Sequence, residues 1–253
     1  RNCGMSFVGL RYAPIKSFVG AFTCLILQKT SYNEDLSRDD IAKAYDFLVQ
    51  GPFPKAEPAP IQWNDNWDSK NDLFQQRNQK AIHQIVLIRH GQYHHKPPES
   101  HEHKLTELGL EQASLTGKRL QELLKAGIVY KINQVHYSTM IRATETWQQI
   151  KPVLAASNQL PSEEHIEACS MIREGAVCPP IPPSSLWKPE GEEFFKDQQR
   201  VEAAFLKYLH RSTLKENKTD ENYSTLLVCH GNVIRYFVMR ALQLPPEAWL
   251  RTA

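Results

Sequence analysis

Two short apolar runs that each end in histidine and glycine constrain this chain most. The first run ends at residues 87–91 (Leu-Ile-Arg-His-Gly) and the second at residues 228–231 (Val-Cys-His-Gly). An apolar run that stops at glycine is typical of a strand buried on both faces of a parallel sheet. Open α/β sheets bind ligands at the carboxyl ends of their strands, so we expect His90 and His230 to share one site.

The arginine before the first histidine favours an anionic ligand. Arg89 would lie at the same sheet edge, where a guanidinium pairs well with phosphate oxygens. Glycine lets the backbone turn sharply and approach a ligand closely. A single His-Gly pair is more often a core histidine bonded to backbone. Two such corners together with Arg89 instead predict a phosphate site.

A third segment points to the same edge. Residues 135–137 are predicted to form a strand and residues 138–146 the helix after it, which places Arg142 one turn after Ser138. Such a strand-to-helix turn attracts anions, because unpaired amide groups and the helix dipole face the incoming charge. We expect Arg142 to reach the same ligand.

These segments belong to a longer ordered series of motifs. The series comprises Arg-His-Gly at 89–91, Leu-Thr-x-x-Gly-x-x-Gln-Ala at 105–113, Ser-x-x-x-Arg-Ala-x-x-Thr at 138–146, Arg-Glu-Gly at 173–175 and Cys-His-Gly at 229–231. From about Ile82 to the C-terminus, the chain resembles the phosphoglycerate mutase branch of the histidine phosphatase superfamily. The resemblance implies a three-layer α/β/α domain with a mostly parallel central sheet. Further motifs at 187–190, 200–211 and 232–236 are similar to those of mitochondrial serine/threonine protein phosphatases in this family.

The resemblance also implies a role for each site residue. His90 would be the nucleophile, with one ring nitrogen unprotonated and the other donating to a backbone carbonyl. Arg89, Arg142 and His230 would hold the phosphoryl oxygens. Glu174 would protonate the leaving oxygen, and a nearby phosphate dianion would raise its pKa. No metal or other cofactor is needed for this chemistry.

The expected function is hydrolysis of phosphoserine and phosphothreonine in proteins through a phosphohistidine intermediate. A phosphatase or mutase acting on small phosphate esters is the alternative among enzymes, because loops and pocket shape decide the substrate. A membrane-tethered assembly scaffold with weak catalysis is the alternative outside enzymes. The complete set of predicted catalytic residues argues against a pure scaffold.

Composition fits one catalytic domain with an extension. The chain has 253 residues, 41% of them hydrophobic, and a net charge of +2, so it can bury a full core, and nucleic acid is not an expected partner. Its five cysteines show no Cys-x-x-Cys spacing. Neither a disulfide framework nor a zinc site is therefore predicted, and a reducing compartment fits best.

The first 33 residues differ in kind from the rest. They contain no acidic residue and four basic ones, which resembles a mitochondrial targeting region. Residues 18–27 are apolar apart from Thr23, a run shorter than the roughly 17–25 residues that a spanning helix needs. On length alone the run fits a signal core or a buried segment. The family resemblance favours an anchor in the outer or inner mitochondrial membrane.

Residues 34–81 are predicted to link this region to the catalytic domain at 82–253. A short helix is expected over residues 37–48, and a proline-rich linker follows at 52–60. Next comes a Trp-Asn-Asp-Asn-Trp-Asp segment, and paired tryptophans on a tether usually mark a docking site. The resemblance implies that this segment drives homo-oligomer assembly, with Asn64 in place of the family's aspartate. The residues expected to mediate it are Trp63, Asn66, Trp67 and Asp68. The alternative is that both indoles pack on the chain's own domain.

Two further features depart from the pattern. Histidines crowd the segment after the first corner, at His94, His95, His101 and His103, but their spacing fits no zinc site, and we expect them to border the active site instead. The chain also stops before the closing strand and tail that such domains carry. We therefore expect the catalytic domain to be truncated at its C-terminus and its sheet to have an exposed edge.

Overall fold

A five-stranded sheet organises the protein in a computed structural model, which describes residues 24–29, 63–68, 81–95, 103–181, 191–210 and 221–251. The strand order is β1-β2-β5-β3-β4. The strands are β1 (Cys24–Lys29), β2 (His83–Arg89), β3 (Ile132–Ser138), β4 (Ile166–Cys169) and β5 (Tyr223–Cys229). The last four are parallel to one another, and β1 is antiparallel to β2. The predicted mostly parallel sheet is confirmed.

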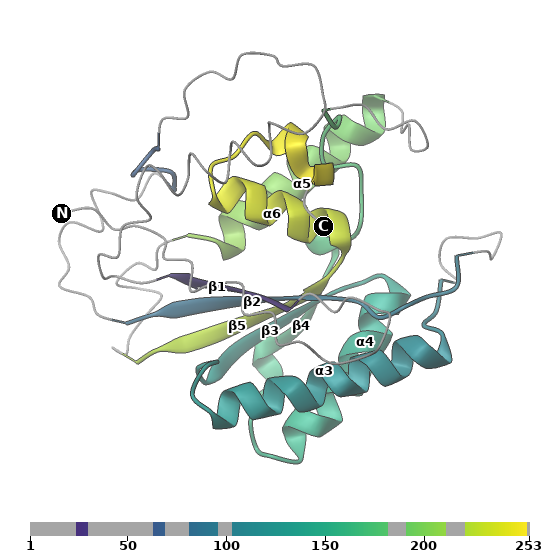
Figure 1. The fold of residues 1–253 in the computed structure, drawn as a ribbon, viewed down its shortest axis with the longest axis vertical. Coiled ribbons are helices and arrows are strands. Elements are labelled where there is room, and N and C mark those ends of the chain that lie inside the picture. The colour runs from purple at the N-terminus through teal and green to yellow at the C-terminus, as the bar shows by residue number, and fades with distance from the viewer. Residues whose placement is uncertain are drawn as a thin grey trace.

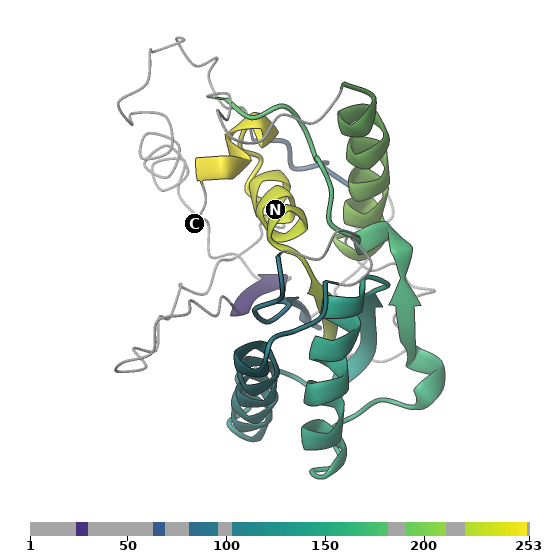
Figure 2. The same ribbon diagram turned by 90° about the vertical axis from the view of Figure 1, so that its right-hand side faces the viewer.

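Helices cover both faces of this sheet (Figure 1). On one face lie α3 (Glu107–Lys125) and α4 (Ile141–Ala155), side by side (Figure 2). On the other face lie α5 (Gly191–Tyr208) and α6 (Gly231–Ala241). Short 3-10 helices complete the described structure: η2 (Glu163–His165), η3 (Ser170–Ile172) and η4 (Pro246–Arg251). The arrangement is the predicted three-layer α/β/α fold.

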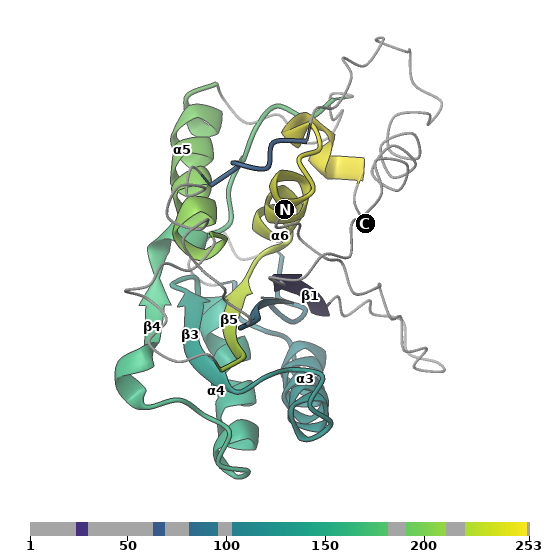
Figure 3. The same cartoon turned by 90° about the vertical axis from the view of Figure 1, so that its left-hand side faces the viewer.

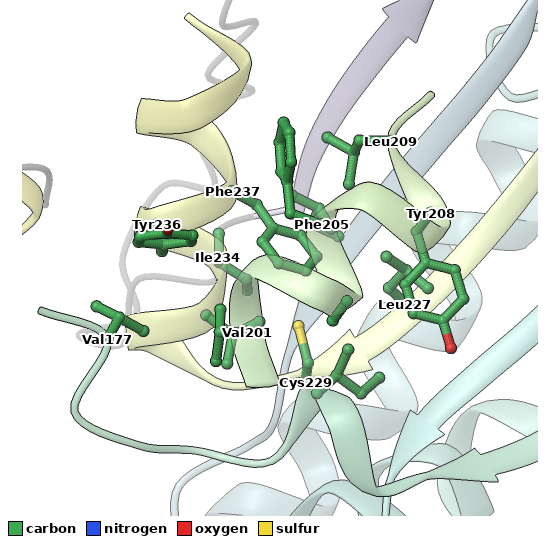
Figure 4. Close-up of a cluster of buried hydrophobic side chains, with 14 of the residues drawn as sticks. Val177, Val201, Phe205, Tyr208, Leu209, Leu227, Cys229, Ile234, Tyr236 and Phe237 are labelled. Atoms are coloured by element: carbon green, nitrogen blue, oxygen red, sulfur yellow. The ribbon is translucent and has the colours of Figure 1, made fainter. Parts of the chain in front are cut away.

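The apolar side chains of the strands contribute to two separate hydrophobic cores, one on each face of the sheet. Along β5, Leu226 and Val228 face the cluster under α3 and α4, whereas Leu227 and Cys229 face the cluster under α5 and α6. Successive side chains of a strand point to opposite faces, so a sheet covered on both sides needs continuous apolar runs. In the second cluster, Phe205 of α5 and Phe237 of α6 meet edge to face at 5.7 Å (Figure 4). This packing fixes α5 and α6 above β5.

The chain after β2 is clamped onto the start of α3. Thr106 caps this helix, its hydroxyl accepting the amide of Gly109 at 3.0 Å. A Cβ on Gly109 would lie 2.0 Å from the carbonyl oxygen of Gln92, and one on Gly91 would lie 2.4 Å from the carbonyl oxygen of Gly109. Only glycine permits so close an approach at both positions. The contact holds the His90 corner against a regular helix.

Strand β1 comes from the segment expected to target and anchor the protein. It pairs with β2 from Lys29 opposite His83 to Cys24 opposite Ile88. Residues 24–27 of the apolar run therefore lie in a strand, and its residues 18–23 lie outside the described ranges. Among the described residues, no helix is both long and apolar enough to cross a membrane. β1 lies along β2 and forms one edge of the sheet, and β4 forms the opposite edge (Figure 3).

Several expectations fall on residues that the structure does not describe. These are the short helix at 37–48, the proline-rich linker at 52–60, His101 and the motif at 187–190.

Candidate active site

The carboxyl ends of all four parallel strands supply the predicted site residues. β2 ends at Arg89 and leads into His90, while its neighbour β5 ends at Cys229 and leads into His230. The amide of His90 donates to the carbonyl oxygen of Cys229 at 3.0 Å, which carries the strand pairing into the corner. β3 leads to Arg142 through the start of α4, and β4 leads through η3 to Glu174. The fold therefore brings the predicted residues to one sheet edge.

The imidazole of His90 is held in one tautomer. Its Nδ1 lies 2.8 Å from the carbonyl oxygen of Gly91, and a carbonyl can only accept, so Nδ1 carries the hydrogen. Its Nε2 accepts a hydrogen bond from Nε of Arg142 at 3.2 Å. Nε2 is therefore unprotonated while Nδ1 donates to a backbone carbonyl, which is the arrangement that the sequence interpretation expected of His90.

Burial keeps both histidines uncharged. His90 is 7% exposed, and burial, followed by the charges of Arg142 and Arg89, lowers its pKa to about 3. The hydrogen bond to Gly91 opposes this shift without reversing it. Burial likewise holds the pKa of His230 well below its ordinary value, with smaller contributions from His90 and Arg142. Near neutral pH both imidazoles are neutral.

His230 lies directly beside His90. Their ring centroids are 5.0 Å apart, and Nε2 of His230 lies 2.7 Å from the hydroxyl oxygen of Ser138. Among the described residues, Nδ1 of His230 is buried and has no hydrogen-bond partner. A buried polar atom without a partner is uncommon in proteins and often marks a binding site.

The two predicted arginines, Arg142 and Arg89, lie near the histidine pair of His90 and His230. Arg142 is buried, and its backbone oxygen accepts the hydroxyl of Thr146, which in turn accepts the amide of Gly91 at 3.1 Å. Arg89 is exposed and lies beside the first residue of α6, since a Cβ on Gly231 would be 3.5 Å from its Nε. Neither α4 nor α6 has a side-chain hydrogen bond at its N-cap, so no cap side chain satisfies their first backbone amide groups.

Glu174 is the acidic member of the site. Burial raises its pKa, and the nearby positive charge of Arg142 opposes the rise. Hydrogen bonds from the backbone amides of Gly175 and Asn232 oppose it further. The net upward shift favours the protonated form that a general acid needs.

A third arginine, Arg200, holds the loop that carries Glu174. Arg200 of α5 donates to the carbonyl oxygens of Met171 and Arg173 at 2.9 and 2.7 Å and to that of Glu174 at 3.3 Å. Its guanidinium also pairs with Asp197 at 2.6 Å. Asp197 in turn accepts the amide of Ala176 at 2.8 Å. The sequence interpretation did not assign this role to Arg200, because it depends on a contact between distant segments.

Ser138 requires a correction. It was predicted to begin a helix, but it is the last residue of β3, and α4 begins at Ile141. Its backbone continues the pairing with Cys169 of β4, and its hydroxyl contacts His230. Arg142 is consequently the second residue of the helix rather than one turn into it. The interpretation also missed Tyr93, which packs on both His90 and Arg142.

The predicted assembly segment packs on its own chain. Trp67 lies against Phe205 of α5, with ring centroids 6.0 Å apart, and joins the edge of the core. The amide of Asn64 donates to Oε1 of Gln243 at 2.7 Å, and Nε2 of Gln243 donates back to the carbonyl oxygen of Asn64 at 3.0 Å. Trp63 and Trp67 are both half-buried. For Trp67 the structure thus favours the alternative of packing on the chain's own domain.

The histidine-rich segment borders the active site. His95 and His103 both contact the ring of Tyr93, with centroid distances of 4.2 and 5.5 Å. In the described ranges, no group of three or more histidine, cysteine, aspartate or glutamate side chains is arranged to hold a metal ion.

Comparison with known proteins defines the class. The family model of the histidine phosphatase superfamily (branch 1) matches residues 85–167 and 181–253, more than half of the chain. The chain therefore belongs to this superfamily, as the motifs predicted. Glu174 lies between the two matched segments, so its assignment depends on its position in the structure.

Similar proteins with known names include mitochondrial serine/threonine-protein phosphatases. The serine/threonine-protein phosphatase Pgam5, mitochondrial, of Drosophila persimilis is 46% identical over 210 residues, covering 75% of this chain and 68% of that protein. The human protein of the same name is 39% identical over 216 residues, covering 78% and 70%. Among solved structures, phosphoglycerate mutase from Plasmodium falciparum is 28% identical and covers 66% of this chain and 73% of its own, with a TM-score of 0.41.

Proposed function

We propose that this chain is a mitochondrial serine/threonine protein phosphatase that works through a phosphohistidine on His90. The observation that carries the proposal is the fixed tautomer of His90, whose Nδ1–H donates to Gly91 while Nε2 keeps its lone pair. The names of relatives at 39–46% identity support both the substrate class and the compartment.

In the first step, the Nε2 lone pair attacks phosphorus. An N–P bond forms, and the bond between phosphorus and the serine or threonine oxygen breaks. Arg142 and His230 lie beside His90, and the charge of Arg89 acts on the same imidazole, so we expect these three side chains to hold the oxygens of the transferred group. Protonated Glu174 gives its proton to the leaving oxygen.

In the second step, the same carboxylate takes a proton from water. The water oxygen attacks phosphorus, and the electron pair of the N–P bond returns to Nε2. Because His90 stays neutral from about pH 5 upwards, no proton has to leave its ring before the next cycle.

The substrate class is tested with purified full-length chain on two substrate sets. One set contains phosphoserine and phosphothreonine peptides, and the other contains phosphoglycerates and similar small esters. We expect kcat/KM for the peptides to exceed that for the small esters. The reverse preference would support an enzyme of small phosphate esters. His165→Ala is a matched control, because this histidine is exposed on η2, away from the site.

We also propose that the protein forms homo-oligomers at a mitochondrial membrane. The segment at 63–68 contacts Phe205 of α5 and Gln243 just after α6. A second copy of the chain presents the same Phe205 and Gln243 to the segment. The segment of one chain could therefore pack on α5 and α6 of another and join the two chains through the contacts it makes within one chain. The basic N-terminal region, which has no acidic residue, supports the mitochondrial part of this proposal.

A further inference from the structure

Tyr93 has no role in the mechanism above, yet it contacts two residues that do. Its ring meets His90 edge on at 5.1 Å, and Cζ of Arg142 lies 4.7 Å from its centroid. The imidazoles of His95 and His103 pack on the same ring. A guanidinium over an aromatic face is attracted by the electron-rich ring. Tyr93 therefore contacts the nucleophile and the phosphate-binding arginine at once.

The backbone holds Tyr93 firmly in this place. It forms an antiparallel bridge with Leu105, and the amide of His94 donates to the carbonyl oxygen of Lys104 at 3.0 Å. The amide of Leu105 is anchored to Glu145 of α4 at 2.6 Å. Since α4 also carries Arg142, the ring and the guanidinium are tied to the same helix.

The covalent step changes what holds Arg142. Before reaction, Nε2 of His90 accepts a hydrogen bond from the Arg142 guanidinium, and the Tyr93 ring packs against the same group. Once Nε2 is bonded to phosphorus, its lone pair no longer accepts that hydrogen bond. The stacking on Tyr93 does not depend on this lone pair and survives the step.

We propose that Tyr93 is a positioning residue for the second half of the reaction. It keeps the Arg142 guanidinium against the phosphoryl group while water attacks the phosphohistidine, and His95 and His103 pack around its ring. This role rests on the proposed phosphohistidine chemistry. It predicts that loss of the ring slows hydrolysis of the phosphoenzyme more than its formation.

The proposed role of Tyr93 is tested by rapid-quench measurement on the purified protein. The measurement follows the amount of phosphohistidine and the release of product. For Tyr93→Leu we expect kcat to fall about tenfold and the steady-state fraction of phosphorylated enzyme to rise. Simple loss of structure would lower that fraction instead. Tyr93→Phe keeps the aromatic face and is expected to recover most of the lost turnover. Tyr130→Leu serves as the matched control, because this half-buried tyrosine precedes β3 at the opposite end of the sheet.

The outcomes separate the two proposals. If wild-type protein forms no phosphohistidine, the proposed mechanism fails, whatever Tyr93 does. If it forms phosphohistidine and Tyr93→Leu does not raise the phosphorylated fraction, the role of Tyr93 is wrong, whether or not turnover slows. A Tyr93→Phe variant as slow as Tyr93→Leu would also overturn it, because the hydroxyl rather than the ring face would then matter.

Discussion

Arg142 donates a hydrogen bond from Nε to Nε2 of His90 over 3.2 Å, and an imidazole can accept it only through an unprotonated nitrogen. Burial, which lowers the pKa of His90 to about 3, acts in the same direction. His90, the proposed nucleophile, and Arg142, the arginine proposed to bind phosphate, are thus oriented before substrate arrives. Such preorganisation is the largest single contribution in many enzymes that stabilise developing charge.

Glu174→Gln is expected to affect poor leaving groups most. Alkyl oxygens need a proton on departure, whereas activated aryl oxygens need little help. Hydrolysis of a phosphoserine peptide should therefore fall by about 10²–10⁴-fold, and that of nitrophenyl phosphate much less. Glu164→Gln, exposed on η2, is the control. Equal losses on both substrates would mean that Glu174 binds or stabilises rather than protonates.

Arg200→Met should weaken both the fold and the acid step. The change removes three hydrogen bonds to loop carbonyls and the ion pair with Asp197, at a site where both side chains are mostly buried. We expect the free energy of unfolding to fall by about 2–3 kcal/mol in urea titrations. Arg119→Met removes only the exposed ion pair with Glu122 and should change it by less than about 1 kcal/mol. Similar values for both variants would contradict a special role for Arg200.

The pair of Glu202 and Arg240 should make stability depend on pH. Burial alone would raise the pKa of Glu202, but hydrogen bonds from Arg240 and Tyr236 outweigh it, and the net pKa is lowered. A carboxyl group with a lowered folded pKa stabilises the fold above its unfolded pKa of about 4.3 and loses this effect as the pH falls through the folded value. The stability difference between wild type and Glu202→Gln should therefore be large at neutral pH and shrink below about pH 4. A difference that is constant across this range would refute the assignment.

The fold and much of the site follow from local patterns. The runs ending at Arg89 and Cys229 mark buried parallel strands, and parallel strands necessarily bring their carboxyl ends to one edge. The Leu-Thr-x-x-Gly-x-x-Gln-Ala motif at 105–113 contains the N-cap and the first turns of α3.

The parts of the fold and site that the sequence did not predict depend on contacts between distant segments. Asn64 is hydrogen-bonded to Gln243, and Arg200 to the loop that carries Glu174. Neither contact leaves a periodic signal in the sequence. Ser138 lies on the boundary between strand and helix, where local preference is weakest. The apolar run at 18–27 is too short to distinguish a strand from a helix by pattern alone, and pairing with β2 is what makes residues 24–29 a strand.

Replacing Trp63 and Trp67 by alanine together tests the assembly segment. If the segment also docks on a second copy, light scattering should show a large assembly for wild type that dissociates in the double variant. Activity on phosphopeptides should fall while the phosphate site stays intact. Leu115→Ala removes an exposed apolar side chain from α3, on the other face of the sheet, and is expected to change neither property. A monodisperse wild-type monomer at high concentration, with unchanged activity in the double variant, would exclude the assembly proposal.

Direct detection of phosphate on His90 tests the central claim most sharply. Wild-type protein quenched in alkali during turnover should carry acid-labile phosphate that mass spectrometry assigns to His90. His90→Ala should carry none and should show no turnover, while circular dichroism and the unfolding midpoint remain close to those of wild type. Retained phosphatase activity in His90→Ala, or a trapped phosphate on any other residue, would contradict the account.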